Sequence, residues 1–193
     1  MMITRIFDCT FERWSPGIGD PGPVGWSIVL AYLVAAGASL SLAARRDRDT
    51  AERVFWTISG AGLLFLAINK QLDLQSLLTA GGRCAAQLQG WYDGRRAVQA
   101  ALITVMLVLS VVCGAGALWF LRGTARRTGI ALLGLVWITG FVLVRAAGFH
   151  HVDRMIGVEI SGLRLNWAFE LGGIAVFLVG CAVASRARPT APR

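Results

Sequence analysis

Residues 24–44 read Val-Gly-Trp-Ser-Ile-Val-Leu-Ala-Tyr-Leu-Val-Ala-Ala-Gly-Ala-Ser-Leu-Ser-Leu-Ala-Ala, a stretch without a charged side chain. A helix of about 20 apolar residues is long enough to cross the hydrocarbon core of a bilayer. The basic sequence Arg45-Arg46 ends this stretch at once. Further apolar runs begin near residues 54, 97, 129 and 163. The sequence therefore predicts an all-α fold, an integral membrane bundle of five transmembrane helices.

The composition excludes an ordinary soluble domain. Hydrophobic residues make up 55% of the 193 residues, above the roughly 45–50% of a typical soluble domain. No basic stretch with a small-residue cleavage site precedes the first apolar run, so we expect no cleavable signal peptide. The formal net charge is +8, and lysine occurs only at Lys70. Because the arginines flank the apolar runs, we expect membrane lipid as the partner and no nucleic acid.

The arginines also predict the orientation of the chain. Ten of them lie on one side of the predicted spans: Arg45, Arg46, Arg48, Arg53, Arg122, Arg126, Arg127, Arg186, Arg188 and Arg193. Seven lie on the other side: Arg5, Arg13, Arg83, Arg95, Arg96, Arg154 and Arg164. Cytoplasmic connections carry the excess of basic residues. We therefore predict a bacterial inner-membrane protein with its N-terminus outside and its C-terminus in the cytoplasm.

This topology divides the chain into three parts. Residues 1–23 form an extracytoplasmic N-terminal segment, residues 24–185 the five-helix transmembrane domain, and residues 186–193 a cytoplasmic basic tail. The first part of the N-terminal segment mixes charged and aromatic residues, and it ends in the turn-rich residues 15–23. It is either a short amphipathic helix in the membrane interface or a partly ordered tail.

The four cysteines show no metal-binding or redox spacing. Cys9 and Cys84 both fall on the predicted extracytoplasmic side, where the oxidising environment permits a disulfide between them. Cys113 and Cys181 fall inside apolar runs, and we expect them to act as small hydrophobic residues.

The second apolar run becomes polar without a helix breaker. After Ile68 it continues Asn-Lys-Gln-Leu-Asp-Leu-Gln-Ser, from residue 69 to residue 76. We predict that the helix continues to about Leu78 and ends at Gly81-Gly82, with Cys84 in the following loop. Asn69, Asp73 and Ser76 would then share one face, because spacings of four and three residues return to the same side of a helix.

Polar residues of three predicted helices lie at a similar depth. Counting about twenty residues outward from the cytoplasmic ends places Lys70, Arg145 and Glu170 roughly one turn below the outer boundary. Charges in hydrocarbon require partners, so we expect these groups to neutralise one another in a polar pocket above an apolar base. The alternative is that the cations extend to lipid headgroups and the polar pairs only join helices. The predicted substrate-binding residues are Asn69, Lys70, Asp73, Arg95, Arg96, Arg145, Asn166 and Glu170.

The stretch 145–154, Arg-Ala-Ala-Gly-Phe-His-His-Val-Asp-Arg, contains both histidines of the chain. His150 or His151 can act as a general base with Asp153, while basic side chains bind a phosphate or carboxylate headgroup. If the two histidines lie in a loop, they can instead converge with Asp153 on zinc or iron. No motif as specific as His-Glu-x-x-His supports the metal. We therefore predict His150, His151 and Asp153 as catalytic residues, or as metal ligands.

Four motifs together resemble a group of small bacterial inner-membrane proteins. They are the sequence 69–75, the Gly-Trp-Tyr at 90–92 with the arginines that follow it, the Phe-His-His-Val-Asp at 149–153, and the Leu-Asn-Trp at 165–167 with Glu170. The resemblance covers residues 54–180. It implies a bacterial source and no mechanism, so it assigns no catalytic role.

Two functions fit these observations. The first is a membrane enzyme that acts on a lipid or a lipid-linked substrate with His/Asp general-base or metal chemistry. The second is a non-enzymatic binding or assembly subunit that holds a lipid, a quinone or a helix of a partner membrane protein. A coupled transporter is disfavoured, because the chain has no internal repeat and no expected charge inside its cytoplasmic half.

Overall fold

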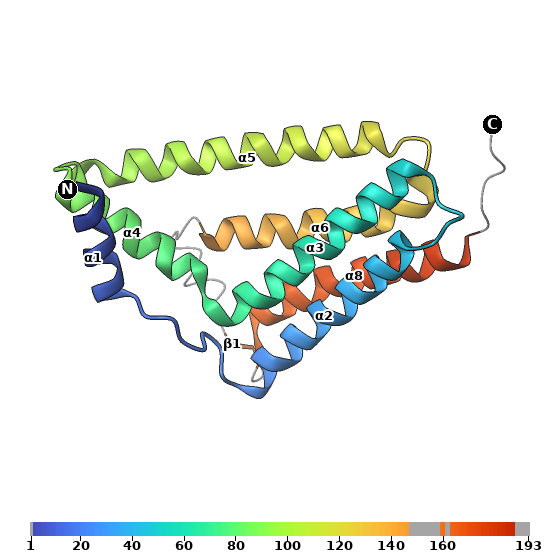
Figure 1. Cartoon of the computed structure of the whole chain (residues 1–193), viewed down its shortest axis with the longest axis horizontal. Helices are drawn as coiled ribbons and strands as arrows, with labels where there is room; N and C mark the ends of the chain where they lie inside the picture. Colours follow the sequence, from blue (N-terminus) through green and yellow to red (C-terminus); the bar gives the residue numbers. More distant parts are fainter. Residues whose placement is uncertain (1, 147–158, 161–162, 188–193) are drawn as a thin grey trace.

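The computed structural model describes residues 2–146, 159–160 and 163–187, and most of them lie in helices (Figure 1). The helices are α1 (Met2–Arg13), α2 (Pro23–Ala43), α3 (Thr50–Leu72), α4 (Leu74–Leu88), α5 (Arg95–Phe120), α6 (Ala125–Ala146) and α8 (Leu165–Arg186), with a short 3-10 helix η1 (Tyr92–Gly94). The antiparallel pair β1 (Glu159–Ile160) and β2 (Leu163–Arg164) precedes α8. The prediction of a helical bundle is confirmed.

Four helices are long and apolar enough to cross a membrane, namely α2, α3, α6 over residues 125–143, and α8. The fifth predicted span corresponds to α5, whose apolar part, Thr104–Phe120, is shorter than these four. α1 and the last turn of α8 lie at opposite ends of the molecule (Figure 1). The α2–α3 connection, the α5–α6 turn and the end of α8 gather at the same end.

The core lies between α2, α3 and α8, and α6 packs along α8. Tyr32, Trp56 and Phe177 are the largest fully buried side chains. Glycines bring α6 and α8 into close contact: a Cβ atom added at Gly134 would lie 2.4 Å from the Phe177 nitrogen, and one at Gly180 would lie 2.3 Å from the Ala131 nitrogen. Small residues allow this approach in membrane helices, where packing replaces the hydrophobic effect as the cause of association.

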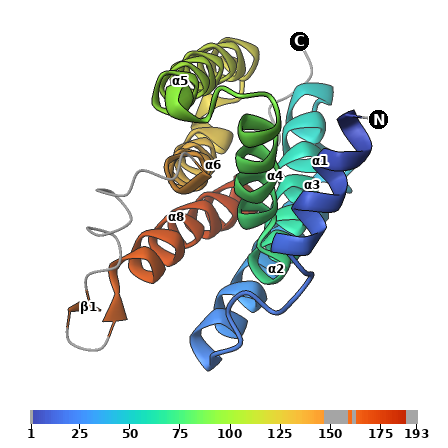
Figure 2. The same ribbon diagram turned by 90° about the vertical axis from the view of Figure 1, so that its left-hand side faces the viewer.

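The remaining helices lie outside this core. Viewed from the end of the bundle, α5 lies beside α6, and α1 lies beside α4 (Figure 2). The Cys9–Cys84 disulfide joins α1 to α4. Of the two possibilities for the N-terminal segment, residues 2–13 are helical, and the disulfide that the predicted topology permits is present.

The predicted continuation of the second span to Leu78 is wrong. The chain breaks at Asp73, which adopts the left-handed backbone conformation with φ 45° and ψ 54°. Aspartate and asparagine enter this region more readily than other side chains with a Cβ. The Asn69 side-chain oxygen accepts a hydrogen bond from the Leu74 N–H at 3.2 Å, and the Asp73 carbonyl accepts one from the Ser76 N–H at 3.0 Å. These bonds replace the helical ones that the break removes.

The predicted helix end at Gly81-Gly82 is also wrong. α4 runs through both glycines to Leu88, so Cys84 lies within a helix and not in a loop. A Cβ atom on Gly81 would lie 3.7 Å from the Thr10 hydroxyl, which places this glycine against α1. Gly81 therefore belongs to the contact between two helices, and neither glycine ends α4.

Candidate functional site

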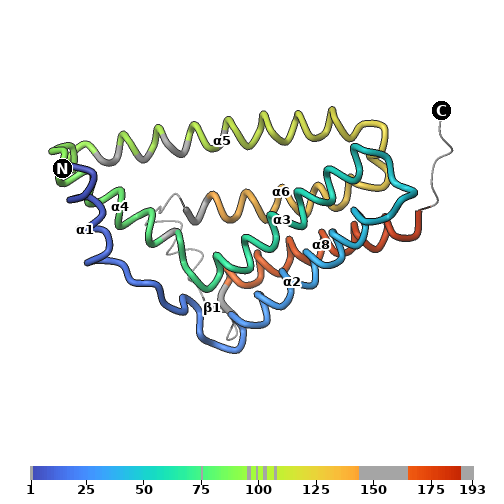
Figure 3. The backbone as a smooth tube through the Cα atoms, viewed as in Figure 1, coloured from blue at the N-terminus to red at the C-terminus, as the bar shows by residue number. Residues whose placement is uncertain are grey.

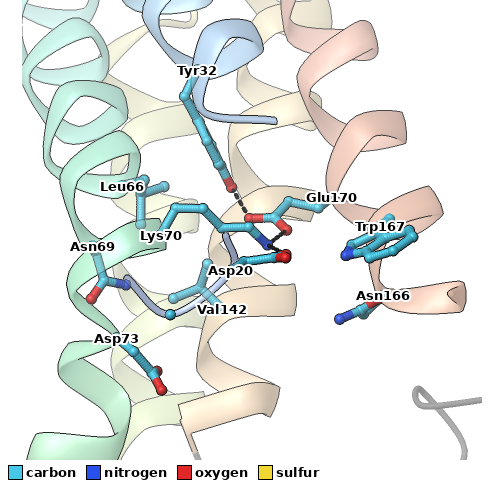
Figure 4. Close-up of a pocket in the computed structure, with 11 residues that line it drawn as sticks. Asp20, Tyr32, Leu66, Asn69, Lys70, Asp73, Val142, Asn166, Trp167 and Glu170 are labelled. Carbon is cyan, nitrogen blue, oxygen red and sulfur yellow. Dashed lines mark hydrogen bonds and ion pairs between the residues drawn. The ribbon is translucent and has the colours of Figure 1, made fainter. Parts of the chain in front are cut away.

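A pocket of about 170 Å³ opens where α2, α3, α6 and α8 meet. Figure 4 shows side chains from these helices around it. It is lined by Gly19, Asp20, Tyr32, Leu66, Asn69, Lys70, Asp73, Val142, Asn166, Trp167 and Glu170. The predicted convergence of the second and last apolar helices on one polar site is therefore present.

A buried network centred on Glu170 forms the base of the pocket. The Lys70 ammonium Nζ lies 2.8 Å from Glu170 Oε2, and the Tyr32 hydroxyl donates a hydrogen bond of 3.0 Å to Glu170 Oε1 (Figure 4). The side chains of Lys70 and Glu170 are only 6% and 5% exposed. Each charge has lost most of its contact with solvent, so the opposite charge and the hydroxyl must compensate that loss. The expected pairing of these two charges is confirmed.

Sequence reasoning missed two members of this network. Asp20 comes from the loop before α2, and its Oδ2 lies 3.8 Å from Lys70 Nζ. Tyr32 lies in the middle of an apolar run, where its hydroxyl is the only polar group within several residues on either side. A buried tyrosine hydroxyl normally requires a partner. The sequence could therefore indicate that the Tyr32 hydroxyl has a polar partner, although it does not identify Glu170 as that partner.

The other predicted residues of this polar site differ in whether they line the pocket and in how they reach it. Asn166 and Glu170 line the pocket together, as their spacing predicts. Asp73 lines it from the break after α3, and not from a continuous helical face. Ser76 does not line it: the Ser76 hydroxyl instead accepts a hydrogen bond of 3.0 Å from the Trp14 indole N–H.

The described lining side chains carry more negative than positive charge. Asp20, Asp73 and Glu170 are carboxylates, and Lys70 is the one cation among the lining residues of the described chain. Lys70 is already engaged by two of the three carboxylates. An anionic ligand would have to compete with both, whereas a cationic group would add to the compensation of charge.

Several predicted site residues do not contribute a described side chain to the pocket. The side chain of Arg145, in the last turn of α6, lies outside the described part of the chain, and so do His150, His151 and Asp153. Arg95 and Arg96 are the first residues of α5. They are separated from Asp73 by α4, whose 15 residues extend about 22 Å along the helix axis. Within the described residues, no group of three His, Cys, Asp or Glu side chains is arranged to hold a metal ion.

A second buried charge cluster lies at the other end of the bundle. Glu52 is fully buried, and its two carboxylate oxygens lie 3.1 Å from Arg48 Nη1 and 3.0 Å from Arg127 Nε. Arg48 also donates a hydrogen bond to the carbonyl of Ala184 at the end of α8. The expectation that no charge lies inside the half of the bundle predicted to be cytoplasmic is wrong. Because α3 already begins at Thr50, Glu52 lies in its first turn and faces the core, and not in a solvated loop.

No family model, curated protein sequence or solved structure matches the chain.

Proposed function

We propose that this chain is a multi-pass protein of the bacterial inner membrane that binds the polar head of a lipid or lipid-linked molecule in its outer leaflet. The observation that carries the proposal is the pocket of about 170 Å³ above the Lys70–Glu170–Tyr32 network, set between apolar helices. Pockets for whole small molecules usually enclose about 300–1,000 Å³. The smaller pocket of this chain suits the headgroup of a lipid whose acyl chains remain in the bilayer.

The orientation in this proposal follows from the basic residues. The arginines of the α2–α3 connection, of the α5–α6 turn and of the end of α8 belong to one end of the molecule (Figure 1). The positive-inside rule makes that end cytoplasmic, and it leaves the pocket facing outward. α5 is then the fifth span, since its 26 residues extend about 39 Å. An odd number of spans is in keeping with the positions of α1 and the last turn of α8 at opposite ends of the molecule (Figure 1).

The preferred headgroup carries an ammonium. Among the described lining residues, Asp20, Asp73 and Glu170 outnumber Lys70, so one more positive charge improves their charge balance. Trp167 also lines the pocket, and aromatic faces attract cations. A zwitterionic head such as phosphoethanolamine supplies this ammonium, whereas a phosphoglycerol head does not.

Lipid retention tests this function. Native mass spectrometry compares phosphatidylethanolamine and phosphatidylglycerol bound to protein taken from nanodiscs of equal composition. We expect phosphatidylethanolamine to be favoured, and Asp73→Asn to reduce its retention about tenfold, the effect of roughly 1.4 kcal/mol. Asparagine tolerates the backbone of Asp73, so the break after α3 persists. Asp93→Asn, at an exposed position in η1, is the matched control. Equal retention of both lipids by the native chain would refute the proposal.

An enzymatic role for the same pocket remains the second candidate. Val142 of α6 lines the pocket, and the stretch with His150, His151 and Asp153 follows α6 in the sequence. Elemental analysis of the purified protein and of a His150→Ala/His151→Ala variant separates the two functions. Stoichiometric zinc or iron that is lost in the variant supports an enzyme. Absence of metal together with a co-purifying lipid or membrane protein supports a binding or assembly subunit.

A further inference from the structure

Residues 14–22, which we call the strap, connect α1 to α2 and form one wall of the pocket. The tube in Figure 3 traces the strap past the junction of α3 and α4. Gly19 and Asp20 of the strap line the pocket directly. Asp20 is also the second carboxylate on Lys70, so the strap supplies part of the charge compensation that keeps this ammonium buried.

The strap is held on the α3–α4 junction by single polar contacts. The Gly19 N–H donates a hydrogen bond of 2.7 Å to the Gln71 carbonyl, and the Gln71 side-chain amide donates one of 3.4 Å to the Asp20 carbonyl. The Trp14 indole N–H donates to the Ser76 hydroxyl on α4. A Cβ atom on Gly19 would lie 3.1 Å from the Asp73 Cβ, so the strap fits closely against the break. Each such hydrogen bond contributes only modestly to stability.

The upstream end of the strap depends on the Cys9–Cys84 disulfide. α4 is the principal neighbour of α1, and the contacts between the two helices include this bond and the Thr10–Gly81 contact. Met2, Ile3, Phe7 and Phe11 of α1 are each more than half exposed, so these apolar side chains contribute little buried surface to hold α1 in place. The bond connects residues 75 positions apart in the sequence. A covalent link of this kind keeps the local concentration of the strap at its site high.

We propose that the strap is a redox-controlled lid of the pocket. With the Cys9–Cys84 bond intact, the strap covers Lys70 and restricts access to the pocket. An extracytoplasmic dithiol reduces the bond: it gives up two electrons, becomes a disulfide itself, and its two protons end on the thiols of Cys9 and Cys84. α1 is then held only by noncovalent contacts, the strap leaves the α3–α4 junction, and the pocket opens. The identity of the ligand admitted rests on the proposed function, whereas the movement of the lid does not.

The chain contains one lysine, which provides a specific probe of the lid. Acylation of amines with a water-soluble anhydride, followed by mass spectrometry of peptides, reports the accessibility of Lys70. The N-terminal amine is the internal reference for the reagent. The full chain carries Cys113→Ser, because Cys113 is exposed, and retains the buried Cys181. One sample stays oxidised, and the other is reduced with dithiothreitol, alkylated at Cys9 and Cys84, and freed of reductant.

We expect acylation of Lys70 to be at least tenfold faster in the reduced sample. A Cys9→Ser/Cys84→Ser variant should match the reduced sample without any treatment. Reactivity of Cys181 towards a maleimide must stay low in every sample, which shows that the α8 core remains closed. Equal acylation rates in the oxidised and reduced samples would overturn the lid. A rise in Lys70 acylation that accompanies a rise in Cys181 reactivity would also overturn it, because the whole bundle would then have opened.

The acylation experiment tests the lid independently of the lipid-retention experiment. Its samples use phosphatidylglycerol nanodiscs without phosphatidylethanolamine, so the proposed ligand is absent. Redox-independent acylation together with selective retention of phosphatidylethanolamine rejects the lid and keeps the binding function. Redox-dependent acylation without lipid selectivity keeps the lid and rejects the proposed ligand.

Discussion

Lys70 and Glu170 show how two charged side chains persist inside an apolar bundle. They lie 100 residues apart in the sequence and 2.8 Å apart in space, with the Tyr32 hydroxyl as a third member. The energetics of such a pair are asymmetric, because one buried charge without its partner costs more than the absence of both. Removal of one member of the pair is therefore expected to cost more than removal of both.

This asymmetry gives the first prediction. Lys70→Met should lower the free energy of unfolding by about 3–5 kcal/mol, since it leaves the buried Glu170 carboxylate without its cation. The double variant Lys70→Met/Glu170→Gln should lose less than Lys70→Met alone. Denaturant titration of the purified protein in mild detergent measures both. The single variant Glu170→Gln is measured in the same way. If the double variant loses as much unfolding free energy as the two single variants together, the side chains do not compensate each other.

The second prediction concerns the buried carboxylate of Glu52. Glu52→Gln removes the negative charge that Arg48 and Arg127 share, so two guanidinium groups face each other across a neutral amide. We expect a loss of roughly 3 kcal/mol or more. Glu12→Gln, at an exposed position of α1, is the control and should change stability by less than about 0.5 kcal/mol. Equal midpoints for the two variants in thermal unfolding would contradict the buried cluster.

At the scale of elements, the contact between α6 and α8 depends on glycine. Gly134→Ala and Gly180→Ala each place a Cβ atom against backbone atoms of the other helix. Overpacking of this kind costs about 1–3 kcal/mol. Gly140→Ala, on the exposed side of α6 with nothing within 4 Å of the added Cβ, should be neutral or slightly stabilising. The unfolding free energies of the three variants are compared directly, and similar losses in all three would argue against close packing at these two glycines.

The sequence predicts helices and helix faces better than it predicts where a helix breaks. The spacing of Asn166 and Glu170 places them on one face whatever else surrounds α8, and the cost of a lone charge requires a partner for Lys70. The break at Asp73 has no comparable local signal. It depends on the Asn69 side chain, which bonds to Leu74, and on Gly19, which comes from a distant part of the chain.

The second buried charge cluster, formed by Arg48, Glu52 and Arg127, was not predicted from the sequence for a related reason. Arg48 and Glu52 occur within a charged stretch that resembles a solvated loop, and only the start of α3 at Thr50 turns Glu52 towards the core. Arg127 reaches it from the start of α6, and no local pattern in the sequence links the two. Likewise, topology permits the Cys9–Cys84 bond, but only the packing of α1 on α4 brings the two cysteines together.

At the scale of the whole molecule, the arrangement predicts a topology that reporter fusions can measure. Fusions after residues 48, 124 and 193 should make green fluorescent protein fluorescent, and a fusion after residue 90 should make alkaline phosphatase active. The physical reason is the excess of arginines at the first three positions. If residues 90 and 124 report the same side, α5 does not cross the membrane. Exchanging the two reporters at each position provides the control.

One helix, α8, contacts the buried charges at both ends of the bundle, and it is the last described helix along the chain. α8 supplies the Glu170 carboxylate for Lys70 at one end and the Ala184 carbonyl for Arg48 at the other. Before α8 is synthesised, Lys70 of α3 lacks this carboxylate. Both buried charge clusters are therefore complete only once α8 has been synthesised, and chains truncated before residue 165 should be less stable because Lys70 lacks the Glu170 carboxylate.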